Sequence, residues 1–412
     1  MFSKDDFTRI PELCNSFARE LEDGHKSITM LDLGEKVDQK TGLVTCCWKQ
    51  LIGEAYEKMM IANKEKNKLV ALEFCQRALK YYKQVKNTNK IDELEGVYNK
   101  LKGEIEFPQF KIELNLQEYI EDCEKQAKAI SQLPAFDIIR FLMVERKLLP
   151  TYRQMEKAAD VLIKSSLKSV VPIQIFDAKG HTVEHFNTEE EIKYFYLLRQ
   201  YKWYLETNFL PLISIIILQT VKENKLTFSF LMDFFKNYSW FGKTLTRKSQ
   251  NKEISYNWLN LLAPSVFEFF SQTEYSLSSG NNPNLVLCID SLVLKIEGLL
   301  RDLCNYSGIT TFAQKRYAKG RIIYNEKDLN ALLHDKRMVN LFDEDNLLFF
   351  KFVLVEKAGY NLRHKVAHSL IGYEEYQVGF SHLLLLLLLK LGKFDFPAIS
   401  ETGKVEEKES KP

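Results

Sequence analysis

One arginine and two histidines occur together in the segment Asn361–His368 of this 412-residue chain. Arg363 carries a forked donor that stays charged and suits a phosphate group. His364 and His368 titrate near neutral pH, so each can accept or donate a proton. Apolar helices are expected on both sides of the segment, and an unpaired buried cation there would be costly. We therefore expect this segment to be the functional site.

Three interpretations of the segment stay open. His364 and His368 have the i, i+4 spacing of a two-histidine metal site, but Lys365 stands where the metalloprotease motif has glutamate. The neighbouring cations would also oppose a dication. The polar residues could instead only cap the start of a helix. In the third interpretation, Arg363 and His368 form a phosphate-directed acid–base pair that uses no cofactor.

The spacing of Arg363 and His368 poses a geometric problem. Five residues on an ideal helix correspond to a rotation of about 140°, so the two side chains cannot share one face of a straight helix. Either the helix begins or bends between them, or they act across a subunit boundary. The second alternative predicts a homodimer formed through the C-terminal domain. The run Leu383–Leu389 would supply its apolar surface, unless that helix packs on the middle of the chain.

A second polar set lies on the helix predicted for residues 284–306. Asp290, Glu297 and Arg301 are spaced by seven and four residues and therefore share one face. Either carboxylate would orient the arginine or a histidine of the motif, and Asn361 is placed in the same supporting group. The alternative is that Glu297 and Arg301 only form an ion pair on the surface.

Cations gather again in the segment Gln314–Arg321, together with a tyrosine. These cations are Lys315, Arg316, Lys319 and Arg321. Cations interleaved with an aromatic residue suit single-stranded RNA, and a plain solvated loop is the equal alternative. The stretch 242–255 is also polar and basic, and we expect a loop there, either solvated or in contact with phosphate.

Composition and hydropathy limit the class of protein. Net charge is only +2, so any nucleic-acid affinity must come from local patches. Seven cysteines without a CxxC motif indicate reduced thiols. The apolar runs Leu210–Val221 and Leu383–Leu389 are shorter than the about 20 residues that span a bilayer, and the N-terminus has no signal-peptide core. We expect a cytoplasmic protein with no membrane contact.

The chain is predicted to be mainly helical, because proline and glycine are few. Residues 1–165 are expected to form an N-terminal helical bundle. One helical stripe there is apolar and consists of Ala71, Leu72, Cys75, Ala78, Leu79 and Tyr82. The flanking segments Leu51–Ile61 and Ile91–Ile105 would pack against it. The pattern resembles a tetratricopeptide hairpin without a clean 34-residue period, so a repeat-like surface for a protein partner is the lesser alternative.

Residues 166–280 are predicted to be a mostly helical middle region with one β-hairpin. Apolar and polar residues alternate in Val171–Phe176 and Thr182–Phe186 around a glycine-containing turn. A helix resumes after Thr188, which has the character of an N-cap. The stretch Ser276–Asn284 is the expected linker.

Residues 281–395 are predicted to form a C-terminal four-helix bundle. Its helices are expected at about 284–306, 326–338, 344–358 and 362–391, the last broken near Gly372. The charged tail, residues 396–412, is expected to be disordered.

The motif Arg363-x4-His368, with polar His364 after the arginine, resembles the signature of the HEPN superfamily. Residues 239–393 more closely resemble a family of uncharacterised bacterial proteins with a C-terminal RNxxxHG motif. The matching stretches are Trp240–Lys243, Leu262–Pro264, Leu294–Asp302 and Gly359–His364. Here His364 replaces the asparagine of that motif, and Ser369 replaces its glycine.

The resemblance implies a HEPN-type bundle and metal-independent RNA cleavage. The ribose 2′-hydroxyl would attack the adjacent phosphate, with His368 as general base or acid and Arg363 stabilising the phosphate charge. His364 would orient either partner. The superfamily also implies a dimer and a role in bacterial defence or growth arrest. The alternative is a non-catalytic RNA- or nucleotide-binding or scaffold protein whose motif only stabilises the bundle.

Overall fold

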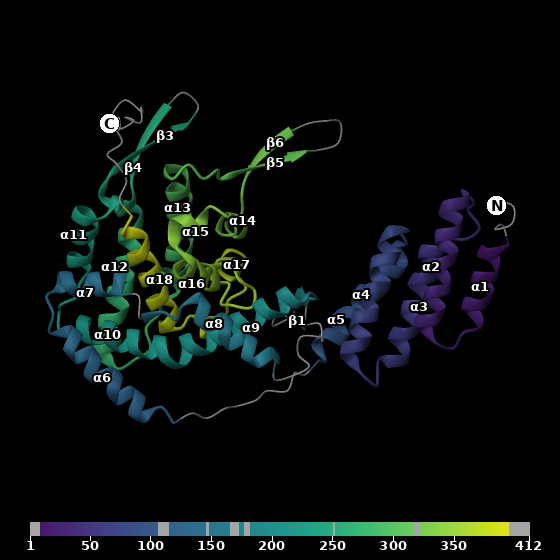
Figure 1. Cartoon of the computed structure of the whole chain (residues 1–412), viewed down its shortest axis with the longest axis horizontal. Helices are drawn as coiled ribbons and strands as arrows, with labels where there is room; N and C mark the ends of the chain where they lie inside the picture. Colours follow the sequence, from purple (N-terminus) through teal and green to yellow (C-terminus); the bar gives the residue numbers. More distant parts are fainter. Residues whose placement is uncertain are drawn as a thin grey trace. The chain divides into compact units, whose positions relative to one another are not determined.

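The computed structural model describes residues 9–105, 115–145, 148–164, 173–176, 182–249, 252–316 and 322–394. Within these ranges the chain is mainly helical, with three two-stranded antiparallel hairpins (Figure 1). The predicted fold class is confirmed at that level. Two compact units are present: residues 1–112 with 174–184, and residues 113–173 with 185–412.

The first unit is built from helices that pack mainly on their neighbours in sequence. They are α1 (Ile10–Glu20), α2 (Gly24–Thr41), α3 (Trp48–Asn63), α4 (Lys68–Gln84) and α5 (Thr88–Gly103). The predicted apolar stripe of α4 is buried between α3 and α5. A groove of about 620 Å³ lies between α1, α2 and α3 and is lined in part by Arg19, Leu51 and Met59. Neighbour-only packing is typical of helical repeats, and a protein partner of this unit stays a prediction.

The second unit contains the remaining helices. They are α6 (Gln117–Ser131), α7 (Ala135–Val144), α8 (Tyr152–Lys164), α9 (Glu189–Tyr204), α10 (Leu210–Lys222), α11 (Phe228–Tyr238), α12 (Trp258–Ser279), α13 (Val286–Tyr306), α14 (Leu329–Leu333), α15 (Met338–Phe342), α16 (Glu344–Leu354), α17 (Leu362–Ala367) and α18 (Val378–Gly392). Two hairpins also lie in this unit, β3 (Thr244–Ser249) with β4 (Lys252–Asn257) and β5 (Phe312–Arg316) with β6 (Ile322–Glu326). Most residues of the third hairpin, β1 (Ile173–Phe176) with β2 (Thr182–Phe186), fall in the first unit.

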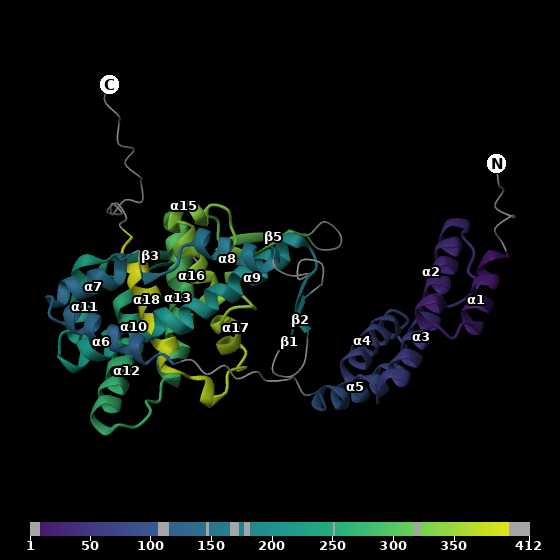
Figure 2. The same cartoon turned by 60° about the horizontal axis from the view of Figure 1, so that its bottom comes forward.

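One hydrophobic core runs through the second unit, from Ala127 to Leu391. The leucine helix α18 lies within it, against α7, α10 and α13 (Figure 2). Leu383–Leu389 is at most 2% exposed. The predicted linker, Ser276–Asn284, separates no cores, because α12 continues to Ser279 and packs on α13. The division into a middle region and a separate C-terminal module is therefore corrected to one unit, which also includes the end of the predicted N-terminal domain.

Some local predictions are confirmed by the structure, and others differ from it. The first hairpin is confirmed in β1 and β2, and Thr188 caps α9 in a capping box with Glu191. The expected loop at 242–255 is instead the hairpin β3–β4, in which Leu245 pairs with Tyr256. The helix expected at 326–338 is the two short helices α14 and α15. The seven cysteines are free thiols, as expected, and the predicted disordered tail lies outside the described residues.

Helices α9 and α10 are joined by a short π-helical turn, Leu205–Phe209, into one continuous run, Glu189–Lys222. By length and composition alone, this run could cross a membrane. Several of its apolar residues, among them Tyr201 and Ile217, are buried in the core of the second unit. The cytoplasmic location stays a prediction.

A buried histidine on α18 is expected to make stability depend on pH. His382 is fully buried, with Nδ1 at 2.8 Å from Ser214 Oγ and, among the described residues, no hydrogen-bond partner for Nε2. Burial lowers its pKa to about 4. Because the unfolded chain takes up this proton near pH 6.5, stability is lost as the pH falls from there towards 4. This histidine should lower the free energy of unfolding at pH 4 by about 3 kcal/mol relative to pH 7.

The measurement is denaturant unfolding of wild type and His382→Leu at both pH values. The difference in unfolding free energy between pH 7 and pH 4 should be smaller in the leucine variant by most of this amount. The reason is that the imidazole, which takes up the proton on unfolding, is absent from it. Equal pH dependence of the two proteins would contradict the prediction.

Candidate functional site

The predicted motif forms the short helix α17, which packs against α13 and α16. The chain turns sharply before it. A side chain at Gly359 would come within 2.3 Å of the Phe352 carbonyl oxygen, so this position requires glycine. Asn361 has a φ of +51°, in the left-handed region that asparagine tolerates, and its side chain makes no capping bond. Its contribution is thus to the backbone turn, and the expected polar cap is not formed by this side chain.

Helix α17 ends at Ala367, before the second histidine of the motif. His368 has a φ of −109°, and Ser369 follows with a φ of +51°. The rotation of about 140° holds only for a regular helix, so it does not describe Arg363 and His368 here. Ser369 takes the backbone conformation that glycine adopts readily, at the position where the resembled motif has glycine.

The structure brings the two histidines together. The ring centroids of His364 and His368 are 4.6 Å apart, and both residues are exposed. Neither ring has a hydrogen-bond partner among the described residues. The pKa of His364 is lowered, first by partial burial and then by the positive charges of His368 and Arg363. A lowered pKa keeps this imidazole neutral at pH 7, which is the state that can accept a proton.

Arg363 is fixed by a carboxylate from α13. Its Nε donates to Glu297 Oε2 at 2.8 Å, and its Nη2 lies 3.5 Å from Oε1. Arg301 Nη2 donates to the same Oε1 at 2.7 Å. Glu297 is only 8% exposed. Burial would raise the pKa of Glu297, but the hydrogen bonds from the two arginines outweigh burial and lower it, so the carboxylate stays charged.

This arrangement leaves one end of Arg363 available. Among the described residues, Nη1 of Arg363 has no hydrogen-bond partner, and its side chain is 29% exposed. A guanidinium held by two of its nitrogens, with a third that has no partner among the described residues, can still donate to a phosphate oxygen. The direct contact between Glu297 and Arg363 therefore supports the predicted orienting role of Glu297.

The other predicted supporting residues have different contacts. Asp290 accepts a hydrogen bond from the Tyr376 hydroxyl at 2.8 Å, so it holds the segment after α17. Of the two carboxylates predicted to orient the motif, Glu297 therefore makes the contact with the arginine, and Asp290 has a different partner. Arg301 joins Glu297 to Glu326, whose Oε2 lies 3.0 Å from Arg301 Nη1. The Glu297–Arg301 pair thus belongs to a network and is not an isolated surface pair.

The predicted RNA-binding cations are described only in part. Lys315 is exposed on β5. Arg316 ends β5, and its side chain lies outside the described part of the structure. Lys319 and Arg321 also lie outside the described residues.

Two contacts that the sequence did not suggest close the loop after α17. Lys365 Nζ binds Glu375 Oε1 at 3.2 Å, and Glu375 Oε2 accepts the backbone N–H of Gly372 at 2.9 Å. The signal in the sequence was a carboxylate ten residues after a lysine, which is too far apart to read without knowing that the chain folds back.

The metal interpretation needs a third ligand beside the two histidines. In the described part of the chain, no three His, Cys, Asp or Glu side chains are grouped so that they could hold a metal ion. What the arrangement does offer is two neighbouring proton carriers beside an anchored cation.

Comparisons of the chain with known protein families, characterised proteins and solved structures find no match.

Proposed function

We propose that this protein is a metal-independent endoribonuclease with Arg363, His364 and His368 as its catalytic residues. The observation that carries the proposal is a pair of exposed imidazoles, 4.6 Å apart, beside an arginine anchored by a buried carboxylate. Cleavage of RNA by its own 2′-hydroxyl requires a proton acceptor, a proton donor and a cation for the phosphate. All three are supplied by six consecutive residues.

In the proposed reaction, neutral His364 takes the proton of the 2′-hydroxyl. The 2′-oxygen forms a bond to phosphorus, and the bond from phosphorus to the 5′-oxygen breaks. His368, in its protonated form, gives its proton to the leaving 5′-oxygen. Arg363 stabilises the charge on the phosphate oxygens while both bonds are partial. The products are a 2′,3′-cyclic phosphate and a 5′-hydroxyl, and the two histidines exchange protonation states.

The finer fold assignment belongs to the same proposal. We propose a HEPN-type arrangement built from α13, α16, α17 and α18, serving bacterial defence or growth arrest as the resemblance implies. Helix α13 supplies Glu297, α17 supplies Arg363 and His364, and His368 follows directly after the end of α17.

The homodimer stays a prediction that rests on the resemblance, because the two reasons drawn from the residues no longer apply. Helix α17 ends before His368, so the rotation argument loses its premise. Leu383–Leu389 is buried within a single chain, so it leaves no apolar surface for a second copy. The catalytic mechanism proposed above uses residues of one chain only.

The test of the proposal is incubation of the purified protein with a labelled RNA in the presence of EDTA. Cleavage should proceed at an unchanged rate, because no step uses a metal ion, and the 5′ fragments should end in 2′,3′-cyclic phosphate. Intact RNA after incubation with folded protein would sink the proposal. Activity that disappears in EDTA and returns with Zn²⁺ or Mg²⁺ would support the two-histidine metal site instead.

A structural role is the second candidate, and one observation favours it. Both Nε and Nη2 of Arg363 are engaged by Glu297, which fastens α17 to α13. In that case the protein is a non-catalytic RNA- or nucleotide-binding or scaffold protein, and replacing either histidine changes nothing that can be measured on RNA.

A further inference from the structure

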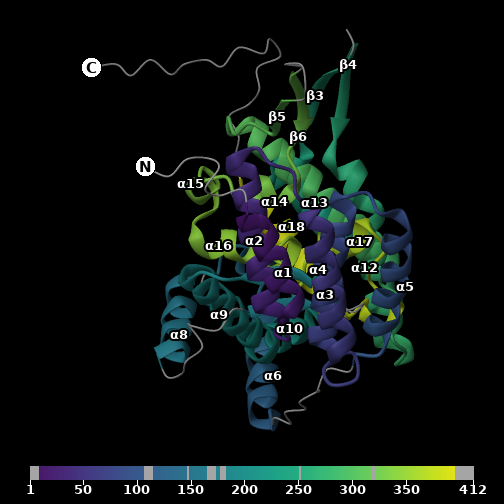
Figure 3. The same ribbon diagram turned by 90° about the vertical axis from the view of Figure 1, so that its right-hand side faces the viewer.

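The hairpin β5–β6 exposes apolar side chains on both of its faces. Phe312 is 49% exposed, Ile322 48%, Ile323 46% and Tyr324 68%. Figure 1 shows the hairpin extending away from α13 and α14, and Figure 3 shows it leaving the same end of the second unit as β3–β4. Large exposed apolar side chains grouped on one element mark an interaction surface.

The strand register separates the two faces of this hairpin. Phe312 pairs with Glu326, and Gln314 pairs with Tyr324. Directly paired residues, and residues two apart on one strand, lie on the same face. Phe312, Ile322 and Tyr324 therefore share a face, which we call the Tyr324 face, whereas Ile323 lies on the opposite one.

The Tyr324 face is the one joined to the candidate site. Glu326, at its inner end, binds Arg301, and Arg301 shares Glu297 with Arg363. Tyr324 lies two residues farther out on the same strand, about 7 Å along it. A strand of nucleic acid whose phosphate meets Arg363 could thus continue outward along the Tyr324 face.

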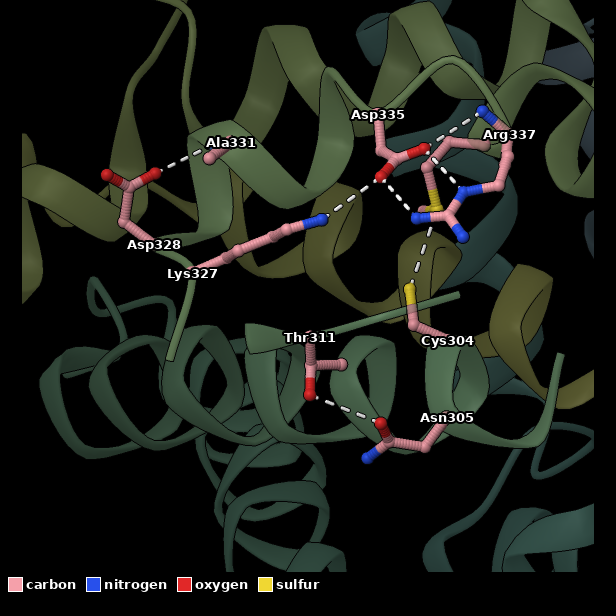
Figure 4. Close-up of polar contacts among 9 residues, drawn as sticks. Cys304, Asn305, Thr311, Lys327, Asp328, Ala331, Asp335 and Arg337 are labelled. Atoms are coloured by element: carbon pink, nitrogen blue, oxygen red, sulfur yellow. Dashed lines mark hydrogen bonds and ion pairs between the residues drawn. The ribbon is translucent and has the colours of Figure 1, made fainter. Parts of the chain in front are cut away.

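The inner end of the hairpin is held firmly. Thr311 Oγ1 donates to Asn305 Oδ1 at 3.2 Å, and Lys327 Nζ lies 3.1 Å from Asp335 Oδ2 (Figure 4). Arg337 also binds Asp335 through two nitrogens. These contacts hold the pKa of Asp335 well below its ordinary value, mainly through the Arg337 hydrogen bond. The hairpin therefore leaves the second unit from a fixed base.

We propose that the Tyr324 face binds single-stranded RNA, with a base stacked on Tyr324. This inference rests on the proposed function and names its substrate class. An exposed aromatic ring stacks on any unpaired base, whereas the bases of a duplex are already stacked on each other. Gln314, which pairs with Tyr324 on this face, can hydrogen-bond to a base edge.

The experiment measures fluorescence anisotropy of the full chain with a labelled single strand whose riboses are 2′-O-methylated, so that it cannot be cleaved. Tyr324→Ala should raise the Kd by roughly five- to a hundredfold. Tyr324→Phe, which keeps the ring, and Ile323→Ala, on the opposite face, should stay within about twofold of wild type. The same sequence as a duplex should bind wild type more weakly and be insensitive to Tyr324→Ala.

The outcomes separate this inference from the proposed function. Binding that Tyr324→Ala weakens, without cleavage of ordinary RNA, would keep the inference and remove the nuclease. Equal effects of Tyr324→Ala and Ile323→Ala, tighter binding of the duplex, or no binding of RNA at all would overturn it. If Tyr324→Ala fails to fold, Ile322→Ala on the same face against Ile323→Ala makes the same comparison.

Discussion

Replacing His368 with alanine is expected to lower the rate of RNA cleavage by about 10²–10⁴-fold. The free energy of unfolding should change by no more than about 1 kcal/mol, because the side chain is exposed and makes no hydrogen bond to the described residues. The variant removes the proton donor to the leaving oxygen and leaves the packing of α17 intact. Single-turnover cleavage of a labelled RNA, beside denaturant unfolding, measures both quantities.

The matched control is His185→Ala, which removes an exposed histidine from β2. It should cleave RNA at the wild-type rate. If His368→Ala unfolds, the motif serves the fold, as the scaffold alternative requires. If it cleaves RNA as fast as His185→Ala, His368 is not catalytic.

His364→Ala should lower the rate to a similar degree and should also change the pH profile. In wild type, cleavage needs neutral His364, whose pKa is lowered from 6.5. The rate should therefore be maintained as the pH falls to 6.5 and should decline only below that value. The residual activity of His364→Ala should lack this acid limb, because the group that titrates has been removed.

The candidate site could be predicted from the types of its residues, whereas its geometry depends on the path of the backbone. Arg363, His364 and His368 could be chosen from sequence because cations among apolar helices need partners. Glu297 could be placed on the correct face of its helix because helical periodicity fixes which residues share a face. The end of α17 before His368 could not be predicted, since it depends on a positive φ at Ser369, which is not a glycine.

The hairpins and the extent of the core were harder to predict, for separate reasons. In β3–β4, Leu245, Ile254 and Tyr256 alternate with polar residues, as in a strand. The many lysines and arginines of this stretch indicated a loop instead, so the alternation was not recognised. The seven consecutive leucines of α18 show that every face of the helix is apolar, and periodicity does not say what covers them. They are covered by α7 and α10, far earlier in the chain, so parts of all three predicted domains share one core.

Glu297→Ala is expected to destabilise the second unit by about 2–4 kcal/mol and to slow cleavage as well. The carboxylate accepts hydrogen bonds from Arg363 and Arg301 in a largely buried position. Removing it leaves two guanidinium groups without their shared counter-charge, and an uncompensated charge is costly where water is excluded. Arg301 keeps Glu326, and both arginines are partly exposed, so the loss should fall short of a fully buried pair.

The comparison that separates stability from positioning is Glu297→Gln. Glutamine keeps the shape and one acceptor oxygen, so it should restore part of the stability, but without charge it holds Arg363 less firmly. Cleavage should then stay roughly 10- to 100-fold below wild type, at a temperature where the variant is fully folded. A further check is pH: because the pKa of Glu297 is lowered, its contribution exists above about pH 4.5 and is lost as the pH falls.

Two results would contradict this account of Glu297. Full activity in folded Glu297→Gln would mean that Arg363 needs no orientation from α13. Additive losses of stability in Glu297→Ala, Arg363→Ala and the double variant would mean that the two residues do not interact, since a pair in direct contact should show a coupling free energy of about 0.5–3 kcal/mol. A coupling in that range, together with the activity lost in Glu297→Gln, would identify the α13 carboxylate as the group that presents Arg363 to the phosphate.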